Sequence, residues 1–358
     1  MLVVLGLVLL GLSELLFGAY ATLALLNHPE IASVAVRRLL GGLFALVLVV
    51  ALVALFLPAW RWGAQAAFAL AVLLFLIAWA QVEPARDREW MPDVARTARA
   101  TVTDTTITFH SVRNFDYRSP TEFDEAWDDR SYRLDLLQGV DLFTSHWKGP
   151  RIAHVLVSFD FGVDGRIAIS IEVRRELGEA FSSLLGLFRH FELAFVVADE
   201  RDLVRLRTNH RKRPEQVYRY RLTGTPEMAR HFLLSFARRI NAAAERPEFY
   251  NTLTTNCTNT MWELSEMNPG RVPFSWKLLI SGYAAEYLYD QGRLDSSVPF
   301  AELTRQGHVN ARAQAADRAP DFSERIRAPL PSSGAFTESP AGSHRRGSMS
   351  SSAKAYNE

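Results

Sequence analysis

Hydrophobic and polar positions divide the chain into an apolar beginning and a long mixed remainder. Residues 39–57 are 19 in a row without a polar side chain, and 64–82 carries polar residues only at its edges. At about 1.5 Å per residue, 19 helical residues span about 28 Å, close to the hydrocarbon thickness of a bilayer. Residues 2–26 are also long enough, although they contain Glu14. The pattern predicts three transmembrane helices within 1–82, with Glu14 either a functional intramembrane acid or a helix–helix hydrogen-bonding group.

Three spans place the loop 27–38 and everything after residue 82 on one side of the membrane. That side carries four arginines near the membrane against one, Arg61, on the other, although acidic residues are interleaved among them. Cytoplasmic loops are usually the more basic ones, so the count alone favours a cytoplasmic location for the long domain.

The remainder mixes strand-like and helix-like runs. Alternation and β-branched residues predict strands at 101–113, 152–161, 167–173, 193–197, 204–208 and 217–222. Caps and apolar spacing predict helices at 225–241, from 256–257 to 268–270, and at 275–290. Strands and helices come in runs, which is typical of the α+β class. We expect a juxtamembrane linker at 83–104, one domain at 105–313, and a disordered tail rich in Ser, Arg and Pro at 314–358.

Composition then excludes several classes of function. All but three of the 40 basic and all but two of the 39 acidic residues follow residue 82, which leaves 37 of each and a formally neutral domain. No basic field favours nucleic acid as a partner. A single cysteine excludes an intrachain disulfide, and neither a Gly-rich phosphate loop nor a clustered metal-ligand motif occurs, so we expect no cofactor and no metal.

That cysteine, Cys257, lies where a helix is expected to begin. Thr255 and Asn256 are residue types that cap helices, and an apolar side follows them. In the first turn of a helix the dipole stabilises a thiolate, and free N–H groups can hold an oxyanion. Cys257 is therefore a candidate nucleophile, and the alternative is a small buried apolar residue.

The hairpin formed by 152–161 and 167–173 supplies partners for such a nucleophile. Its odd positions are apolar, whereas even positions carry polar side chains that include His154 and Glu172. A three-residue loop at 163–165 sets 154 opposite 174 and places Glu172 diagonal to His154, roughly 7–8 Å away. His154 is the predicted base and Glu172 the carboxylate that orients it. A solvated sheet face with chance polar residues is the alternative.

Nearby polar residues are candidates for binding the substrate. They are Arg174, Ser158 and Ser170 on the hairpin, Tyr250 and Asn256 before the cysteine, and Arg207 in an arginine-rich run that can clamp a phosphate headgroup. His146 and Trp147 can line a lipid groove or belong to an ordinary core. The acidic run 124–130 is interpreted as a solvated helix face and not as a metal site.

Several segments together resemble a known family. They are RNFDYR (113–118), HVLVSFDF (154–161), ISIEVRRE (169–176), FVVADERDLVRLRTNHR (195–211), VYRYRL (217–222) and PEFYNTLTTNCT (247–258). In this order, over roughly 105–310, they resemble the Lnb N-terminal periplasmic domain family. The resemblance implies a circularly permuted, papain-like (NlpC-type) thiol enzyme in which the histidine precedes the cysteine, as His154, Glu172 and Cys257 do here.

The resemblance also carries expectations about activity and location. It implies acyl transfer through a thioester, with phospholipid as donor and the N-terminus of a lipoprotein as acceptor. It places the domain in the periplasm, held to the inner membrane by a multi-pass anchor, against the arginine count. The order of segments departs from the acyltransferase, in which the soluble domain comes first. A peptidase or amidase acting on cell-wall peptide, and a non-catalytic ligand-binding domain with the same shell, stay open as alternatives.

Overall fold

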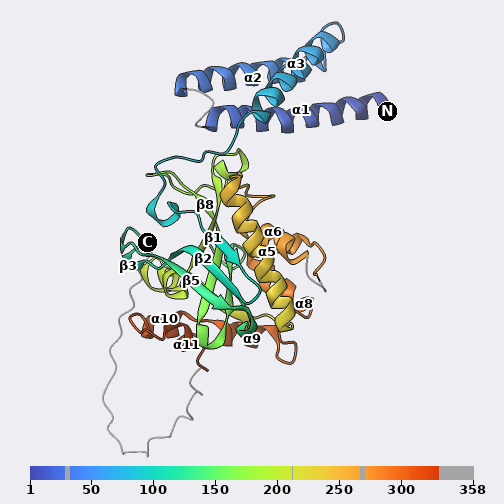
Figure 1. Cartoon of the computed structure of the whole chain (residues 1–358). Coiled ribbons are helices and arrows are strands. Elements are labelled where there is room, and N and C mark those ends of the chain that lie inside the picture. Colours follow the sequence, from blue (N-terminus) through green and yellow to red (C-terminus); the bar gives the residue numbers. More distant parts are fainter. Residues whose placement is uncertain (29–32, 212, 267–270, 330–358) are drawn as a thin grey trace, which may run out of the picture.

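The computed structural model describes residues 1–28, 33–211, 213–266 and 271–329, and it consists of three long helices followed by a domain built on one large sheet (Figure 1). The longer helices are α1 (Leu2–Asn27), α2 (Val34–Ala54), α3 (Arg61–Ala80), α5 (Pro226–Glu245) and α6 (Cys257–Glu266). Shorter helices are α4 (Glu200–Arg205), α7 (Trp276–Leu279), α8 (Ala284–Asp290), α9 (Phe300–Gly307), α10 (Asn310–Ala315) and α11 (Phe322–Arg325). The strands are β1 (Arg99–Val102), β2 (Thr106–Arg113), β3 (Asp116–Ser119), β4 (Glu122–Asp124), β5 (Trp127–Arg133), β6 (Gly139–His146), β7 (Ala153–Asp160), β8 (Arg166–Arg174), β9 (Glu192–Ala198) and β10 (Gln216–Arg221).

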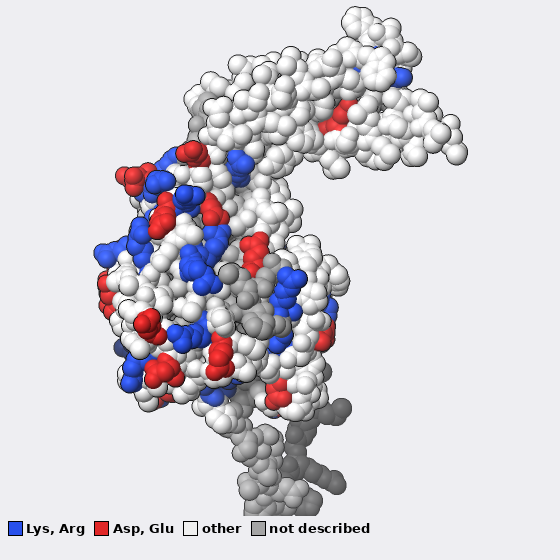
Figure 2. Space-filling view, turned by 45° about the vertical axis from the view of Figure 1, so that its right-hand side comes forward, with Lys and Arg blue, Asp and Glu red and all other residues white. Residues whose placement is uncertain are grey.

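The first three helices fit the predicted membrane anchor. Each is long and apolar enough to cross a membrane, with mean hydropathy between 2.1 and 2.3 over its best window. On the face seen in Figure 2, the surface of these helices is almost free of charged residues, whereas Lys, Arg, Asp and Glu are mixed over the domain. Small residues allow close packing, since Gly18 of α1 lies against Leu48 of α2.

The domain contains a mixed sheet with the strand order β1-β2-β9-β8-β7-β6-β10, and β5 also pairs with β2, outside this order. β2 and β9 pair in parallel and the other neighbours are antiparallel. This arrangement confirms the predicted α+β class. The sheet places β7 and β8, the predicted hairpin, in its interior.

Both faces of the sheet are covered. On one face, Phe232 and Phe236 of α5 pack on Phe159 of β7, with ring centroids 5.9 Å apart in each case. The other face lies under α4, α10 and α11, where Leu156 of β7 shares a buried cluster with Phe322. The even positions of the hairpin are therefore not on a solvated face, because these short helices cover them.

The hairpin has a different register from the one expected. Ser158 pairs with Ala168, two residues from its expected partner, because β7 ends earlier and the connection 161–165 has five residues instead of three. The sides of the sheet stay as predicted, since a shift of two residues preserves the alternation. When the same register is continued from the pair Leu156–Ser170 toward residue 154, Glu172, and not Arg174, lies opposite His154.

Four predicted elements are wrong in detail. The expected strand 204–208 is helical, because Asp199 caps α4 by accepting from the N–H of Arg201 and the helix buries its apolar side. The strand 101–113 is interrupted by a turn in which Thr103 bonds to Thr106, so β1 and β2 form a hairpin. The helix 275–290 is broken where Gly282 approaches the backbone of residues 150–151. Residues 124–130 lie in β4, β5 and their connection, not on a helix.

The two ends of the domain extend beyond the expected boundaries. β1 belongs to the sheet, so the linker does not reach residue 104. Residues 314–329 are packed rather than disordered, because Phe322 and Ile326 are buried and Arg327 forms ion pairs inside the domain. The predicted tail at 330–358, like the expected helix end at 268–270, lies outside the described residues.

Candidate active site

Cys257 is the first residue of α6, as predicted. The side chain of Asn256 caps this helix: its Oδ1 accepts hydrogen bonds from the N–H groups of Thr258 and Asn259, both at 2.9 Å. The Asn256 side chain, which was expected to bind the substrate, therefore caps the helix. The thiol lies at the positive end of the helix dipole, which favours the thiolate.

His154, near the start of β7, contacts this thiol. The imidazole of His154 and the backbone of Val155 lie close enough to the sulfur to lower the pKa of Cys257, and Thr258 Oγ1 lies 3.8 Å from the same sulfur. Residues 103 positions apart in the chain are joined here because α6 packs against β7. The backbone contact of Val155 was not foreseen, since its side chain is simply one of the apolar residues of the hairpin.

Glu172 of β8 lies behind the imidazole. Its Oε1 is 3.2 Å from His154 Nε2, and the hydroxyl of Ser170 bridges the two at 2.7 Å from Glu172 Oε1 and 2.6 Å from His154 Nε2. Arg207 Nη2 donates to the same carboxylate oxygen at 2.8 Å. The side chains of His154 and Glu172 are only 17% and 23% exposed, so these charges act in a medium that screens them poorly.

The charges in this cluster support one another. Burial disfavours the imidazolium, but the Glu172 charge and contacts with Cys257 outweigh it and raise the pKa of His154 to about 9. Burial likewise raises the pKa of Cys257, but the hydrogen bond and positive charge of His154 lower it by more. The pKa of Glu172 is well below its usual range despite burial, because His154 and Arg207 stabilise the carboxylate. This arrangement favours a thiolate–imidazolium pair at neutral pH.

Other predicted residues are distributed around or away from this cluster. Ser170 and Arg207 belong to it, although as supports of Glu172. Tyr250 is buried, and its pKa is raised, first by burial and then by the negative charges of Cys257 and Glu172. Ser158 donates instead to Glu200 at 2.5 Å. Arg174 bonds the carbonyls of residues 94 and 95 and stacks over a tryptophan, so it holds the juxtamembrane segment.

The sequence did not predict that Glu215 lies next to Arg207 and Ser145 next to Glu215. Ser145 of β6 donates to Glu215 at 2.5 Å, and Glu215 lies 3.9 Å from Arg207 Nε. Because β6 was not predicted, no signal placed Ser145 near the hairpin.

A largely apolar cavity of about 160 Å³ reaches Thr258, the residue after Cys257. The wall of this cavity includes Thr258, which follows Cys257 in the chain, and Val155, whose backbone lies near the sulfur. Further wall residues belong to β6, β7, α5, α6 and α8, and they include Leu142, Val157, Met228, Phe232, Met261 and Leu288. The predicted groove residues His146 and Trp147 line a different hollow, at the end of β6. Over the part of the chain that the structure describes, no three His, Cys, Asp or Glu side chains gather as a metal site requires.

Residues 123–282 match the model of the family described as the Lnb N-terminal periplasmic domain. The resemblance seen in the sequence is thereby confirmed. The matched stretch contains Cys257, His154 and Glu172, and the three helices lie before it. No curated protein and no solved structure matches the chain. A periplasmic domain family together with three candidate spans indicates a membrane protein with a periplasmic domain.

Proposed function

We propose that this protein is a membrane-anchored thiol enzyme that transfers an acyl group through a thioester on Cys257. The observation that carries the proposal is the contact of Cys257 with His154, whose imidazolium is stabilised by Glu172. The order histidine, carboxylate, cysteine along the chain supports a permuted papain-like mechanism. An inert buried cysteine does not require a charged partner with a carboxylate behind it.

The chemistry follows from these three side chains. The Cys257 thiolate attacks an ester carbonyl, a sulfur–carbon bond forms, and the carbon–oxygen bond breaks while the His154 imidazolium protonates the leaving alkoxide. Neutral His154 then takes a proton from the acceptor amine or water as it attacks the thioester, and Cys257 leaves as the thiolate. Asn256 occupies the N–H groups of Thr258 and Asn259, so the N–H of Cys257 and the helix dipole stabilise the oxyanion.

The surroundings support an acyl donor from the membrane. The cavity beside Thr258 has apolar walls suited to methylene groups, and the anchor keeps the domain at the lipid headgroups. We therefore take phospholipid as the donor class and the N-terminal amine of a lipoprotein as the acceptor class, with the three helices spanning the inner membrane. Neither nucleic acid nor a cofactor takes part in this scheme.

Intact-mass measurement tests the scheme. The purified full-length protein, incubated with phospholipid vesicles, should gain one acyl mass that hydroxylamine removes. Cys257→Ser and His154→Ala should lose the adduct, whereas His231→Ala, at an exposed histidine of α5, should keep it. Undiminished turnover in Cys257→Ser would overturn the mechanism. Product formed with water but never on a supplied lipopeptide amine would instead favour the hydrolase.

A further inference from the structure

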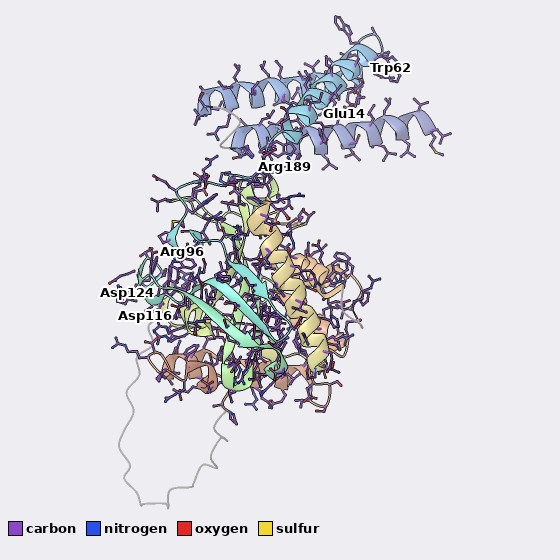
Figure 3. All side chains as sticks on the ribbon, viewed as in Figure 1. Glu14, Trp62, Arg96, Asp116, Asp124 and Arg189 are labelled. Carbon is purple, nitrogen blue, oxygen red and sulfur yellow. The ribbon has the colours of Figure 1, made fainter. Side chains whose placement is uncertain are left out.

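The loop between β8 and β9 packs against the three helices of the anchor. Phe188 is 2% exposed and belongs to the hydrophobic cluster of the three helices, with its ring centroid 5.4 Å from that of Tyr20. Arg189 donates to the carbonyl of Trp79 at 2.6 Å, and His190 donates to the carbonyl of Asn27 at 3.1 Å. Figure 3 shows Arg189 at the top of the domain, directly beside the helices. This loop therefore lies where the spans end.

The same loop packs on the segment that precedes the nucleophile. Thr252 donates its N–H to the carbonyl of Gly186 at 3.1 Å and its hydroxyl to the carbonyl of Ser183 at 2.8 Å. A side chain at Gly186 would collide with Thr252 and approach Tyr250. One continuous set of contacts thus runs from the membrane helices to the residues before Cys257.

Several apolar side chains on these two segments are exposed, and three of them lie at the contact between the segments. Phe181, Leu184 and Leu253 are 40%, 55% and 57% exposed. Phe181 contacts Tyr250, with ring centroids 6.3 Å apart, and the carbonyl of Leu253 accepts from Asn259 in the first turn of α6. Single exposed apolar residues are ordinary, but a group that continues a buried apolar interface marks a contact surface.

We propose that Phe181, Leu184 and Leu253, here called the apolar rim, insert into the lipid surface and form the entrance through which a membrane lipid reaches Cys257. Lipid is the favoured partner because the apolar rim continues the interface between the loop and the membrane helices: Phe188, four residues after Leu184, packs among those helices. Transfer of an exposed leucine or phenylalanine side chain from water to the boundary between headgroups and acyl chains lowers the free energy of the system. The entrance role rests on the proposed function, whereas contact of the rim with lipid does not.

The contact is tested without catalysis. In a Cys257→Ser background, single cysteines introduced by Leu184→Cys, Leu253→Cys and Val163→Cys carry an environment-sensitive fluorophore, in nanodiscs whose phosphatidylcholine has brominated acyl chains. Val163 is 87% exposed at the far end of the hairpin and is the matched control. Bromine should quench the probes at 184 and 253 and leave the probe at 163 unaffected. Equal quenching at all three positions, or none at 184 and 253, would overturn the proposal.

The entrance is tested by comparing two donors. Adduct formation is measured with phospholipid in nanodiscs and with a water-soluble short-chain thioester. The double variant Leu184→Asp/Leu253→Asp should lower the ratio of the first rate to the second at least tenfold, and Val163→Asp should leave the ratio unchanged. An unaltered ratio in the double variant contradicts the entrance. If the unmodified protein reacts with neither donor, the proposed function fails, while the quenching result still decides whether the rim meets lipid.

Discussion

His154 Nε2 lies 3.2 Å from Glu172 Oε1, on neighbouring strands of one sheet and with a serine hydroxyl bonded to both. Three features fix this distance: the strand register, the ion pair and the bridging hydroxyl. The imidazole consequently has one favoured orientation, in which its ring can also reach Cys257.

The thiol should react quickly at a pH where ordinary cysteines are inert. Because His154 lowers the pKa of Cys257, iodoacetamide should label the folded protein near pH 6. His154→Ala removes the stabilising charge and should slow labelling at pH 6 by at least tenfold, with less effect at pH 10. Rates are read by mass spectrometry, and His231→Ala should behave as the unmodified protein. Labelling that appears only after unfolding would contradict the assignment.

The alkaline limit of activity should reflect His154. Its pKa is raised to about 9, so the imidazolium, which is the general acid of the proposed mechanism, is present below that pH and lost as pH rises through it. Acyl transfer should therefore fall above about pH 9. In Glu172→Gln the main source of the raised pKa disappears, so the alkaline limb should move down toward the ordinary value of about 6.5, with kcat reduced by roughly 10²–10⁴ if general acid catalysis is impaired. An unmoved limb contradicts this role for Glu172.

Arg207 should act through Glu172 and not on the substrate. Its guanidinium is almost fully buried and helps to hold the carboxylate charged. Arg207→Met should therefore raise the pKa of Glu172 and shift the acid limb of the activity profile to higher pH, while KM for the acyl donor changes little. Arg201→Met, at a more exposed arginine that pairs with Asp116, is the control. A changed KM with an unchanged pH profile would instead return Arg207 to the substrate site.

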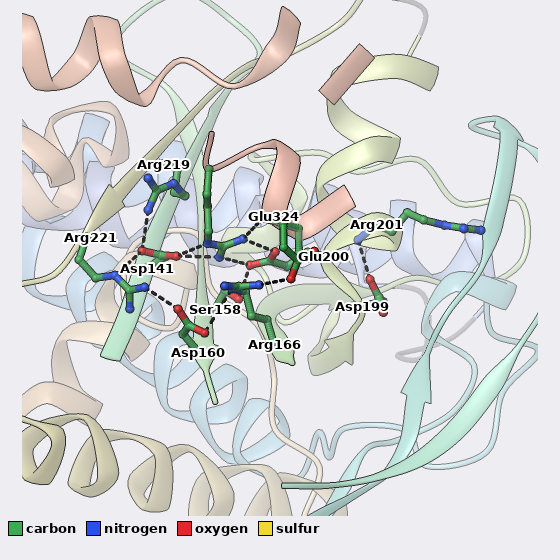
Figure 4. Close-up of polar contacts among 12 residues, drawn as sticks. Asp141, Ser158, Asp160, Arg166, Asp199, Glu200, Arg201, Arg219, Arg221 and Glu324 are labelled. Carbon is green, nitrogen blue, oxygen red and sulfur yellow. Dashed lines mark hydrogen bonds and ion pairs between the residues drawn. The ribbon is translucent and has the colours of Figure 1, made fainter. Parts of the chain in front are cut away.

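The C-terminal part of the domain should be essential for stability. Arg327 Nη2 lies 2.7 Å from Asp141 Oδ2 and 2.5 Å from Glu200 Oε1, and both carboxylates are fully buried, in the cluster drawn in Figure 4. Arg327→Met leaves them without this partner and should cost about 3–5 kcal/mol. Arg325→Met removes an exposed pair and should change the free energy of unfolding by less than about 0.5 kcal/mol.

Truncation is a second test of how residues 314–329 contribute to stability. Deletion of 314–358 removes Phe322, Ile326 and Arg327 and should lower the melting temperature strongly, whereas deletion of 330–358 should leave it nearly unchanged. Both are measured by thermal unfolding in one detergent. Equal melting temperatures for the two truncations would show that the packing of 314–329 contributes nothing.

The topology can be read in cells. A periplasmic domain predicts that alkaline phosphatase fused after residue 358 is active and that green fluorescent protein at the same place is dark, because it does not fold after export in unfolded form. The reverse pattern would put the domain in the cytoplasm, as the arginine count favours, and would exclude a periplasmic acceptor.

Local pattern was enough to predict the three long helices, the start of α6 and the alternation of β7 and β8. Each depends on residues close together in the chain: an apolar run, the Asn256 cap, a period of two. Even the pairing error was small, because a shift of two residues returns His154 and Glu172 to the same side of the sheet.

What the pattern missed depends on partners far away in the chain. The run 204–208 contains residues typical of strands, but burial against α10 and α11 favours a helix there. Arg327 is one more arginine in a polar sequence until Asp141 and Glu200, 186 and 127 residues earlier, surround it. The match to the family model rests on sequence alone, and it ends at residue 282, before α10, α11 and Arg327.

The docking of Arg189 on Trp79 and of Phe188 among the helices has a kinetic consequence. A catalytic domain on a free tether samples a volume, but one fixed to its own spans moves only as they diffuse. Encounters with a bilayer substrate then occur in two dimensions, and the rate should follow the mole fraction of substrate in the membrane plane. Adding inert lipid at constant total substrate should therefore slow the proposed reaction by surface dilution, whereas adding buffer should not.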